Sequence, residues 1–307
     1  MRGRRLVLFI LLIPFSLSCS FSMNWMPTPT PTFFVFPTET AVLIPPLTSD
    51  MIRNMDYTLQ DFNGNSHAYR LTDGVFQGGA DPAAVDFVSV VLGEQIVFGD
   101  LNDDGAEDAA TTIAINFGGT GVFVSVAAVV NENGKPRHAA SWLIDDRPRV
   151  NDLRIQNGTI LVDAVIHGPN DPGCCPAQPV TQTYRLTASG LTLVRATSKT
   201  PGGLERAIVI ESPFDGSEVS GAVRIQGNVT IAPFENNLSY RIYNGEGNEI
   251  AAGPLMVSAP DLGAPGTFDS TLDLAAFPPG PILLVIADFS AADGSVLAMD
   301  SVRLVVR

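Results

Sequence analysis

The sequence has almost no lysine, few cysteines and no apolar run as long as a membrane span. Lys135 and Lys199 are its only lysines, and its 307 residues carry a formal net charge of −14 at pH 7. Nucleic acids bind clusters of Lys and Arg, so we expect no nucleic-acid partner. Three cysteines are too few for a disulfide-rich scaffold. The hydrophobic fraction of 45% excludes a wholly disordered chain.

Sequence patterns of common catalytic sites are also missing. The chain contains no G-x-S-x-G, no H-E-x-x-H, no phosphate-binding P-loop and no dinucleotide fingerprint. Its three histidines, His67, His138 and His167, lie in different predicted strands or loops. Asp145–Arg147 offers adjacent carboxylates, but such neighbours in one turn are usually solvated. We therefore expect a protein that is not an enzyme.

Residues 1–19 have the pattern of a secretory signal. Arginines precede the apolar run Leu6–Phe15, which is followed by small residues and Cys19. The run is shorter than the roughly 20 residues that cross a bilayer. Phe15–Cys19 resembles a bacterial lipobox, which implies that Cys19 becomes the lipid-carrying first residue of the mature protein. A signal cleaved elsewhere, with Cys19 discarded, is the alternative. With the lipid, the protein is expected at the bacterial cell membrane, facing outside the cytoplasm.

Residues 20–49 are predicted to form a stalk. The alternation of Pro and Thr in Met26–Thr32 favours extended polyproline II backbone, and such a segment cannot bury enough surface to fold.

Residues 50–196 are predicted to form a β-rich domain. Short runs of β-branched and aromatic residues alternate with turns, and Asn133-Gly134 and Asn157-Gly158 are strong hairpin signals. The run 121–131 is apolar at nearly every residue, as in a central strand that is buried on both faces, and its expected partner is 109–117. Asp81–Val91 could hold one short helix, so this domain is all-β or α+β.

An Asp-rich loop lies at residues 99–108. Asp100, Asn102, Asp104 and Asp108 occupy positions 1, 3, 5 and 9 of a calcium-loop pattern, with Gly105 at position 6. Position 12 lacks the glutamate of an EF-hand, and an apolar strand follows. The segment resembles the loop-then-strand calcium sites of FG-GAP and integrin-type proteins. Calcium is therefore the one cofactor suggested, and a solvated turn without metal is the alternative.

The second unusual motif is the pair Cys174-Cys175, which stands between Pro172 and Pro176. Three alternatives are open: a vicinal disulfide, two buried thiols, or a pair with redox or soft-metal function near His167. The Asp-rich loop and this turn, in this order, resemble an uncharacterised bacterial envelope domain over about residues 85–195. That domain has no assigned activity, so the resemblance implies no catalytic residues.

After a predicted linker at 197–203, residues 204–307 show evenly spaced strand patterns typical of an immunoglobulin-like β-sandwich. Five segments, beginning at Ile208, Ile225, Phe234, Gly266 and Phe289, resemble the immunoglobulin-like domain of bacterial spore germination proteins. The resemblance implies an interaction or spacer module without catalytic residues.

Together these features predict a mainly β, non-enzymatic envelope lipoprotein. It would be held at the membrane through lipid on Cys19 and would bind or scaffold an unidentified envelope protein or polysaccharide through its immunoglobulin-like domain. A redox- or metal-responsive protein that uses Cys174 and Cys175 is the first alternative. An envelope hydrolase is the second, and it would need His138 or His167 beside Asp or Ser.

Overall fold

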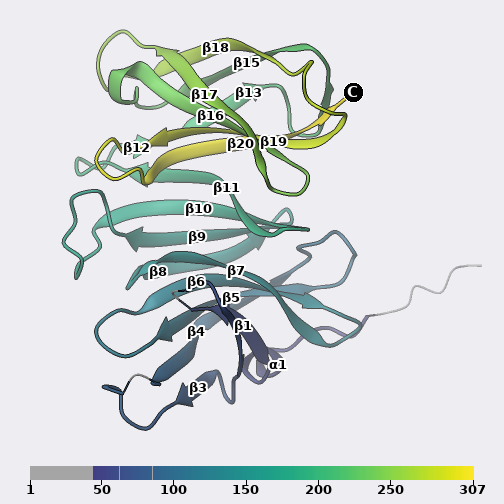
Figure 1. Ribbon diagram of the computed structural model, residues 1–307, viewed down its shortest axis with the longest axis vertical. Helices are drawn as coiled ribbons and strands as arrows, with labels where there is room; N and C mark the ends of the chain where they lie inside the picture. The colour runs from purple at the N-terminus through teal and green to yellow at the C-terminus, as the bar shows by residue number, and fades with distance from the viewer. Residues whose placement is uncertain (1–43, 62, 85) are drawn as a thin grey trace, which may run out of the picture. The chain divides into compact units, whose positions relative to one another are not determined.

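The computed structural model describes residues 44–61, 63–84 and 86–307, and its fold is mainly β, as predicted (Figure 1). The predicted signal peptide with Cys19, and the stalk up to residue 43, lie outside the described residues. Within the described ranges, no helix is long and apolar enough to cross a membrane. We call residues 44–199 the N-terminal module and residues 204–307 the C-terminal module.

The N-terminal module has three layers (Figure 1). Helix α1 and the β1–β2 hairpin cover one face of a five-stranded antiparallel sheet, and four antiparallel strands at the end of a 13-stranded sheet cover its other face. The outer layer comprises α1 (Ser49–Arg53), β1 (Asp56–Gln60) and β2 (Ser66–Arg70). The five-stranded sheet comprises β3 (Val75–Gly78), β4 (Val88–Gly99), β5 (Asp108–Asn116), β6 (Phe123–Asn131) and β7 (Pro136–Asp146). The four strands on the other face are β8 (Arg149–Gln156), β9 (Thr159–Ile166), β10 (Gln178–Thr187) and β11 (Gly190–Lys199).

Strand β6 is buried on both faces, which confirms the prediction for this run. Ala127 and Val129 pack in the core beneath the β1–β2 hairpin, while Val126 and Ala128 pack in the core shared with β8–β11. Its antiparallel partner is β5, as predicted. A strand that lies between two layers needs apolar side chains at every position, because alternate residues point to opposite faces.

Both predicted Asn-Gly hairpins are present. Asn133 and Gly134 have φ of 56° and 85° between β6 and β7, and Asn157 and Gly158 have φ of 51° and 69° between β8 and β9. Positive φ at both central residues gives the turn the twist that matches its strands.

The short helix considered at Asp81–Val91 was a wrong prediction. The described residues of 81–87 form turns, with the Ala84 N–H donating to the Asp81 carbonyl at 2.9 Å, and β4 begins at Val88. The β-branched residues from Val88 onward favour a strand. The only α-helix among the described residues is α1, five residues long.

The C-terminal module is a β-sandwich around its own core (Figure 1). One sheet contains β13, β15 and β18, the other contains β16, β19, β20 and β14, and β17 pairs with β16 and then, at its end, with β18. Fully buried side chains such as Ile225, Ile286 and Phe268 fill the space between them. The elements are β12 (Glu205–Arg206), β13 (Ile208–Ser212), β14 (Ser217–Val219), β15 (Ala222–Val229), η1 (Phe234–Asn236), β16 (Asn237–Asn244), β17 (Glu249–Ser258), β18 (Gly266–Asp273), β19 (Gly280–Phe289) and β20 (Val296–Val306).

The two modules are joined through strands β11 and β20. Strand β11 runs to Lys199, so it takes up the first three residues of the predicted linker. Ala196 pairs with Met299, the Ser198 hydroxyl donates to the Leu297 carbonyl at 2.5 Å, and the Ser301 hydroxyl donates to the Val194 carbonyl at 2.7 Å. A hydrophobic cluster crosses the junction; its buried members are Ala196, Val285, Ala287 and Met299. The junction is therefore held by backbone pairing and apolar packing.

Candidate functional site

The Asp-rich loop connects β4 to β5, and its side chains bond to its own backbone. The Asp100 carboxylate accepts the N–H groups of Asn102 at 3.2 Å and of Gly105 at 2.8 Å. The Asp104 carboxylate accepts the Ala106 N–H at 2.8 Å and the Asn102 side-chain amide at 3.0 Å. Short Asp and Asn side chains commonly stabilise turns in this way. Asp100, Asn102 and Asp104 are therefore brought together as a hydrogen-bonded turn.

The fourth predicted ligand, Asp108, has a different position. Its side chain is fully buried at the start of β5, where it accepts the Leu101 N–H at 3.0 Å and the Asn131 N–H at 2.8 Å. Burial raises the pKa of Asp108, and the two N–H donors partly offset that effect. Asp108 thus ties the start of the loop to the end of β6.

Within the described residues, no group of three or more His, Cys, Asp or Glu side chains is arranged to hold a metal ion. Both Asp108 oxygens face backbone amides, and the exposed side chains of Asn102 and Asp104 bond to each other. These hydrogen bonds give the Asp and Asn side chains of the loop protein partners that do not include a cation. Calcium binding stays a prediction of the sequence.

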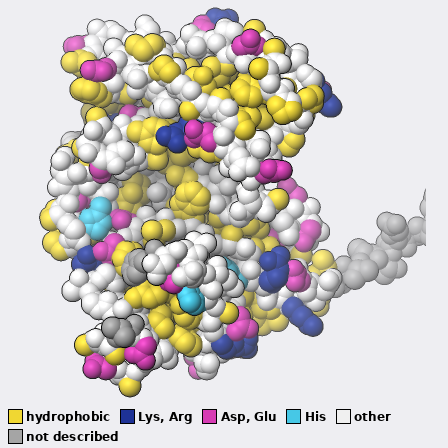
Figure 2. All heavy atoms as spheres, viewed as in Figure 1, with side chains coloured by type: hydrophobic (Ala, Val, Ile, Leu, Met, Phe, Trp, Pro, Cys, Tyr) yellow, Lys and Arg dark blue, Asp and Glu magenta, His cyan; other side chains and the backbone are white. Residues whose placement is uncertain are grey.

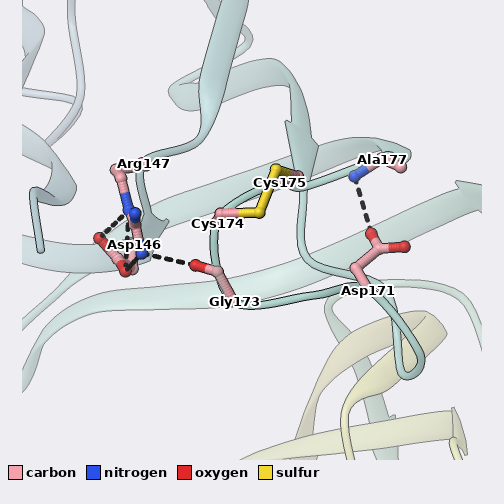
Figure 3. The surroundings of a disulfide bond; sticks show 7 residues. All are labelled: Asp146, Arg147, Asp171, Gly173, Cys174, Cys175 and Ala177. Atoms are coloured by element: carbon pink, nitrogen blue, oxygen red, sulfur yellow. Dashed lines mark hydrogen bonds and ion pairs between the residues drawn. A yellow bond between two sulfur atoms is a disulfide. The ribbon is translucent and has the colours of Figure 1, made fainter. Parts of the chain in front are cut away.

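The two cysteines form a vicinal disulfide at the tip of the β9–β10 loop (Figure 3). Cys174 and Cys175 are both exposed, so the alternative of buried thiols does not hold. The loop is closed at its base by Asp171, whose carboxylate accepts the Gly168 N–H at 2.8 Å and the Ala177 N–H at 2.7 Å. These two donors lower the pKa of Asp171.

Three residues from the end of β7 and the β7–β8 turn support this loop. The Arg147 guanidinium donates to the Gly173 carbonyl at 2.5 Å and to Asp146 at 2.6 Å, and this bond with Asp146 raises the pKa of Arg147 (Figure 3). The Asp145 carboxylate lies 2.8 Å from His167 Nδ1. The sequence showed the adjacent charges of Asp145–Arg147 but not their contacts with the cysteine loop.

The Asp-rich loop and the cysteine loop lie at opposite ends of β9. Gly158, just before β9, packs beside Asp100 and Asp103, whereas the cysteine loop follows Ile166 at the other end. An eight-residue strand separates its ends by about 25 Å. The two predicted sites are therefore independent.

The histidines of the hydrolase alternative each have one suitable neighbour. His138 and Ser141, on β7, line a groove of about 730 Å³ between β1 and β7, and His138 Nε2 lies 2.8 Å from the Ser141 hydroxyl. The Thr58 N–H donates to His138 Nδ1 at 3.2 Å, so Nε2 must carry the proton and donate to Ser141. Burial lowers the pKa of His138 to about 4. In this state His138 cannot take a proton from Ser141.

His167 also lacks the rest of a catalytic set. Its Nδ1 is paired with Asp145, while its Nε2 is buried without a hydrogen-bond partner in the described structure. A base needs a nucleophile within hydrogen-bond reach of its free nitrogen. Neither histidine therefore completes a nucleophile–base–acid arrangement among the described residues.

Comparison with known families finds one matching model, the immunoglobulin-like domain of bacterial spore germination, over residues 207–295. The predicted resemblance is confirmed. The match covers β13 to the end of β19, so this immunoglobulin-like module is the C-terminal β-sandwich. Comparison with curated proteins finds no match. The module accounts for a β-rich unit of a binding type.

Proposed function

We propose that this protein is a non-enzymatic envelope lipoprotein, held to the membrane through lipid on Cys19, that binds or scaffolds an envelope protein through its immunoglobulin-like module. The match of residues 207–295 to an immunoglobulin-like domain is the observation that carries the proposal. The junction through β11 and β20 supports a scaffolding role, because it fixes one module to the other without a free linker.

The charge distribution also supports a protein partner. On the face that Figure 2 shows, Lys and Arg side chains stand singly or beside Asp and Glu, and they form no continuous basic patch among the described residues. Such a surface does not attract nucleic acid or other strongly anionic polymers.

One end of the immunoglobulin-like module exposes large apolar side chains. Phe234 is 71% exposed, Leu262 is 80% exposed and Met256 is 63% exposed. The Ala232 N–H donates to the Ala264 carbonyl at 2.8 Å, and Met256 pairs with Asn237, so these side chains come from adjoining segments. We call Phe234, Met256 and Leu262 the apolar end. Exposed aromatic and aliphatic anchors are typical of protein interfaces.

The apolar end lies among acidic side chains. Glu235 follows Phe234 directly and Asp261 precedes Leu262, and both are exposed. Complementary charges guide the choice of partner. We therefore propose a protein partner with an apolar contact surface and a basic rim.

Changing the apolar end is expected to abolish cross-linking of the protein to its envelope partner. The double variant Phe234→Ser/Leu262→Ser removes two anchors of the kind that typically contribute more than 1 kcal/mol each, which would weaken binding at least tenfold. The measurement is chemical cross-linking in intact envelopes, followed by separation of the cross-linked species.

The matched control is Phe214→Ser. Phe214 is 78% exposed but follows the end of β13 that pairs with Gln226, whereas the apolar end lies beyond Val229 at the other end of this pairing, so its variant should cross-link normally. Equal cross-linking in both variants would contradict the proposal. Loss of binding to purified cell-wall polysaccharide, with protein cross-links retained, would favour a polysaccharide partner instead.

The lipid anchor has a separate test. Cys19→Ala is expected to move the protein from the membrane fraction to the soluble extracytoplasmic fraction, because acyl chains contribute about 0.8 kcal/mol per buried CH₂. Fractionation with radiolabelled palmitate incorporation measures both location and lipid. A wild-type protein that incorporates no palmitate, together with a Cys19→Ala variant that fractionates like it, would contradict lipidation.

A further inference from the structure

The Cys174–Cys175 disulfide does not link separate parts of the fold. The two residues are adjacent, so the bond closes no chain segment between them. The stabilisation that a disulfide gives through the unfolded state grows with the length of the closed loop. A bond between neighbours therefore has little stabilising effect of this kind, and stability does not explain the pair.

The cysteine loop has its own support besides the disulfide. Asp171 holds Gly168 and Ala177 together at the base, and Arg147 holds Gly173 next to the tip (Figure 3). The Cys175 N–H donates to the Pro172 carbonyl at 2.8 Å and closes the turn. None of these bonds uses a sulfur atom, so they can persist when the S–S bond opens.

The pair is accessible, and a cation lies on one side of it. Both cysteines are exposed, which thiol–disulfide exchange requires because a thiolate must reach a sulfur atom. The Arg147 guanidinium bonds to Gly173, the residue directly before Cys174. A nearby cation favours a thiolate, although the paired Asp146 and the neighbouring Asp145 offset much of this charge. Because Arg147 reaches the loop on the Cys174 side (Figure 3), we expect Cys174 to be the better leaving group.

We infer that Cys174–Cys175 is a thiol–disulfide exchange site that oxidises an external dithiol. One thiolate of that dithiol attacks Cys175 Sγ, the S–S bond breaks, and Cys174 leaves as a thiolate that then takes a proton. The second thiol of the partner loses its proton and attacks the partner's own sulfur in the mixed disulfide, and Cys175 leaves as a thiolate that takes a proton. The partner becomes a disulfide and the protein gains two thiols, so two electrons and two protons are transferred. This activity goes beyond the proposed binding role and does not depend on it.

The first experiment measures native reduction of the full chain carrying Cys19→Ala, in which the pair supplies the only thiols. Millimolar dithiothreitol without denaturant is expected to give two alkylatable thiols by mass spectrometry and to shift the melting temperature by less than about 4 °C, which corresponds to about 1 kcal/mol for a chain of this size. The Cys174→Ser/Cys175→Ser double variant should melt like the reduced protein. Reduction that requires denaturant, or a larger shift, would overturn the inference.

The second experiment tests whether Arg147 makes Cys174 more reactive than Cys175, which would not be expected of a disulfide that is only accessible. In the Cys19→Ala background, Cys175→Ser leaves Cys174 and Cys174→Ser leaves Cys175. At pH 7 the free Cys174 is expected to react about fivefold faster with an aromatic disulfide reagent, because the cation favours its thiolate. Arg147→Gln should remove the difference and Arg147→Lys should keep most of it. Equal rates in the two single variants, or no effect of Arg147→Gln, would overturn the inference.

Discussion

Asp108→Ala is expected to lower the free energy of unfolding by about 3–5 kcal/mol. This is a large effect for a residue of a loop whose sequence is also typical of a solvated turn. The carboxylate is fully buried and accepts the N–H groups of Leu101 and Asn131. Removing it leaves two donors unpaired in the interior, and each unpaired group costs about 1–3 kcal/mol. Urea unfolding followed by circular dichroism measures the effect.

The matched control is Asp104→Ala in the same loop. Asp104 is exposed and accepts a single N–H from a buried residue, that of Ala106, whereas Asp108 accepts two, so the loss of Asp104 should cost about 1–2 kcal/mol. Similar losses in the two variants would contradict the structural role given to Asp108.

The same variants test the calcium prediction. Calorimetry of calcium into the wild-type chain, with heat that disappears in Asp104→Ala, would support a site at the loop. Sites in extracellular modules bind at about 10⁻⁴–10⁻³ M, so titration must reach millimolar calcium. Absence of heat at that concentration would leave the loop as a metal-free turn, which its hydrogen bonds already permit.

The sequence predicted those parts of the fold that depend on the backbone conformation or burial of neighbouring residues. The Asn-Gly turns need positive φ, and β6 needs apolar residues on both faces, so both were visible in the sequence. Strands β7 and β17 gave weak signals, because Pro136–Asp146 is rich in polar residues and Glu249–Ser258 contains Ala, Gly and Pro. Pairing with β6 and β16 makes these segments strands. Such tertiary pairing overrides weak strand propensity.

The sites could be predicted only in part for a similar reason. The Asp-rich spacing located the loop, but not the burial of Asp108, which depends on the distant Asn131. The sequence also located the cysteine pair, but not Arg147, which reaches it from the β7–β8 turn 26 residues away. The junction could not be predicted either, since it joins Ala196 to Met299 across the whole C-terminal module.

The second large effect concerns pH. We expect the folded protein to lose about 2–3 kcal/mol of stability through His138 as the pH falls from about 6.5 to about 4. Burial lowers the pKa of His138 from 6.5 to about 4, and Arg137 adds to this effect. Between these pH values His138 binds a proton in the unfolded chain but not in the folded chain, so acid favours unfolding. Each unit of difference between the two pKa values corresponds to about 1.4 kcal/mol.

His138 has a structural reason to stay neutral when folded. Its Nδ1 accepts the Thr58 N–H at 3.2 Å, and that bond joins the β1–β2 hairpin to β7. Protonation of Nδ1 would replace an acceptor by a second donor and break this link. Acid should therefore loosen the outer layer of the N-terminal module first, which hydrogen exchange at β1 would detect.

The variant His138→Gln separates this residue from the carboxylates that also titrate. Burial raises the pKa of Asp108, Asp288 and Asp300. The folded chain therefore binds protons at these groups more readily than the unfolded chain, so they increase stability as the pH falls, whereas His138 decreases it. These groups are common to both proteins, so the difference between the two stability curves reports His138 alone. Between pH 4.5 and 6 that difference should change by about 1 kcal/mol or more per pH unit. Parallel curves would show that His138 is protonated equally in the folded and unfolded chains, and the link between Thr58 and His138 would then not control acid stability.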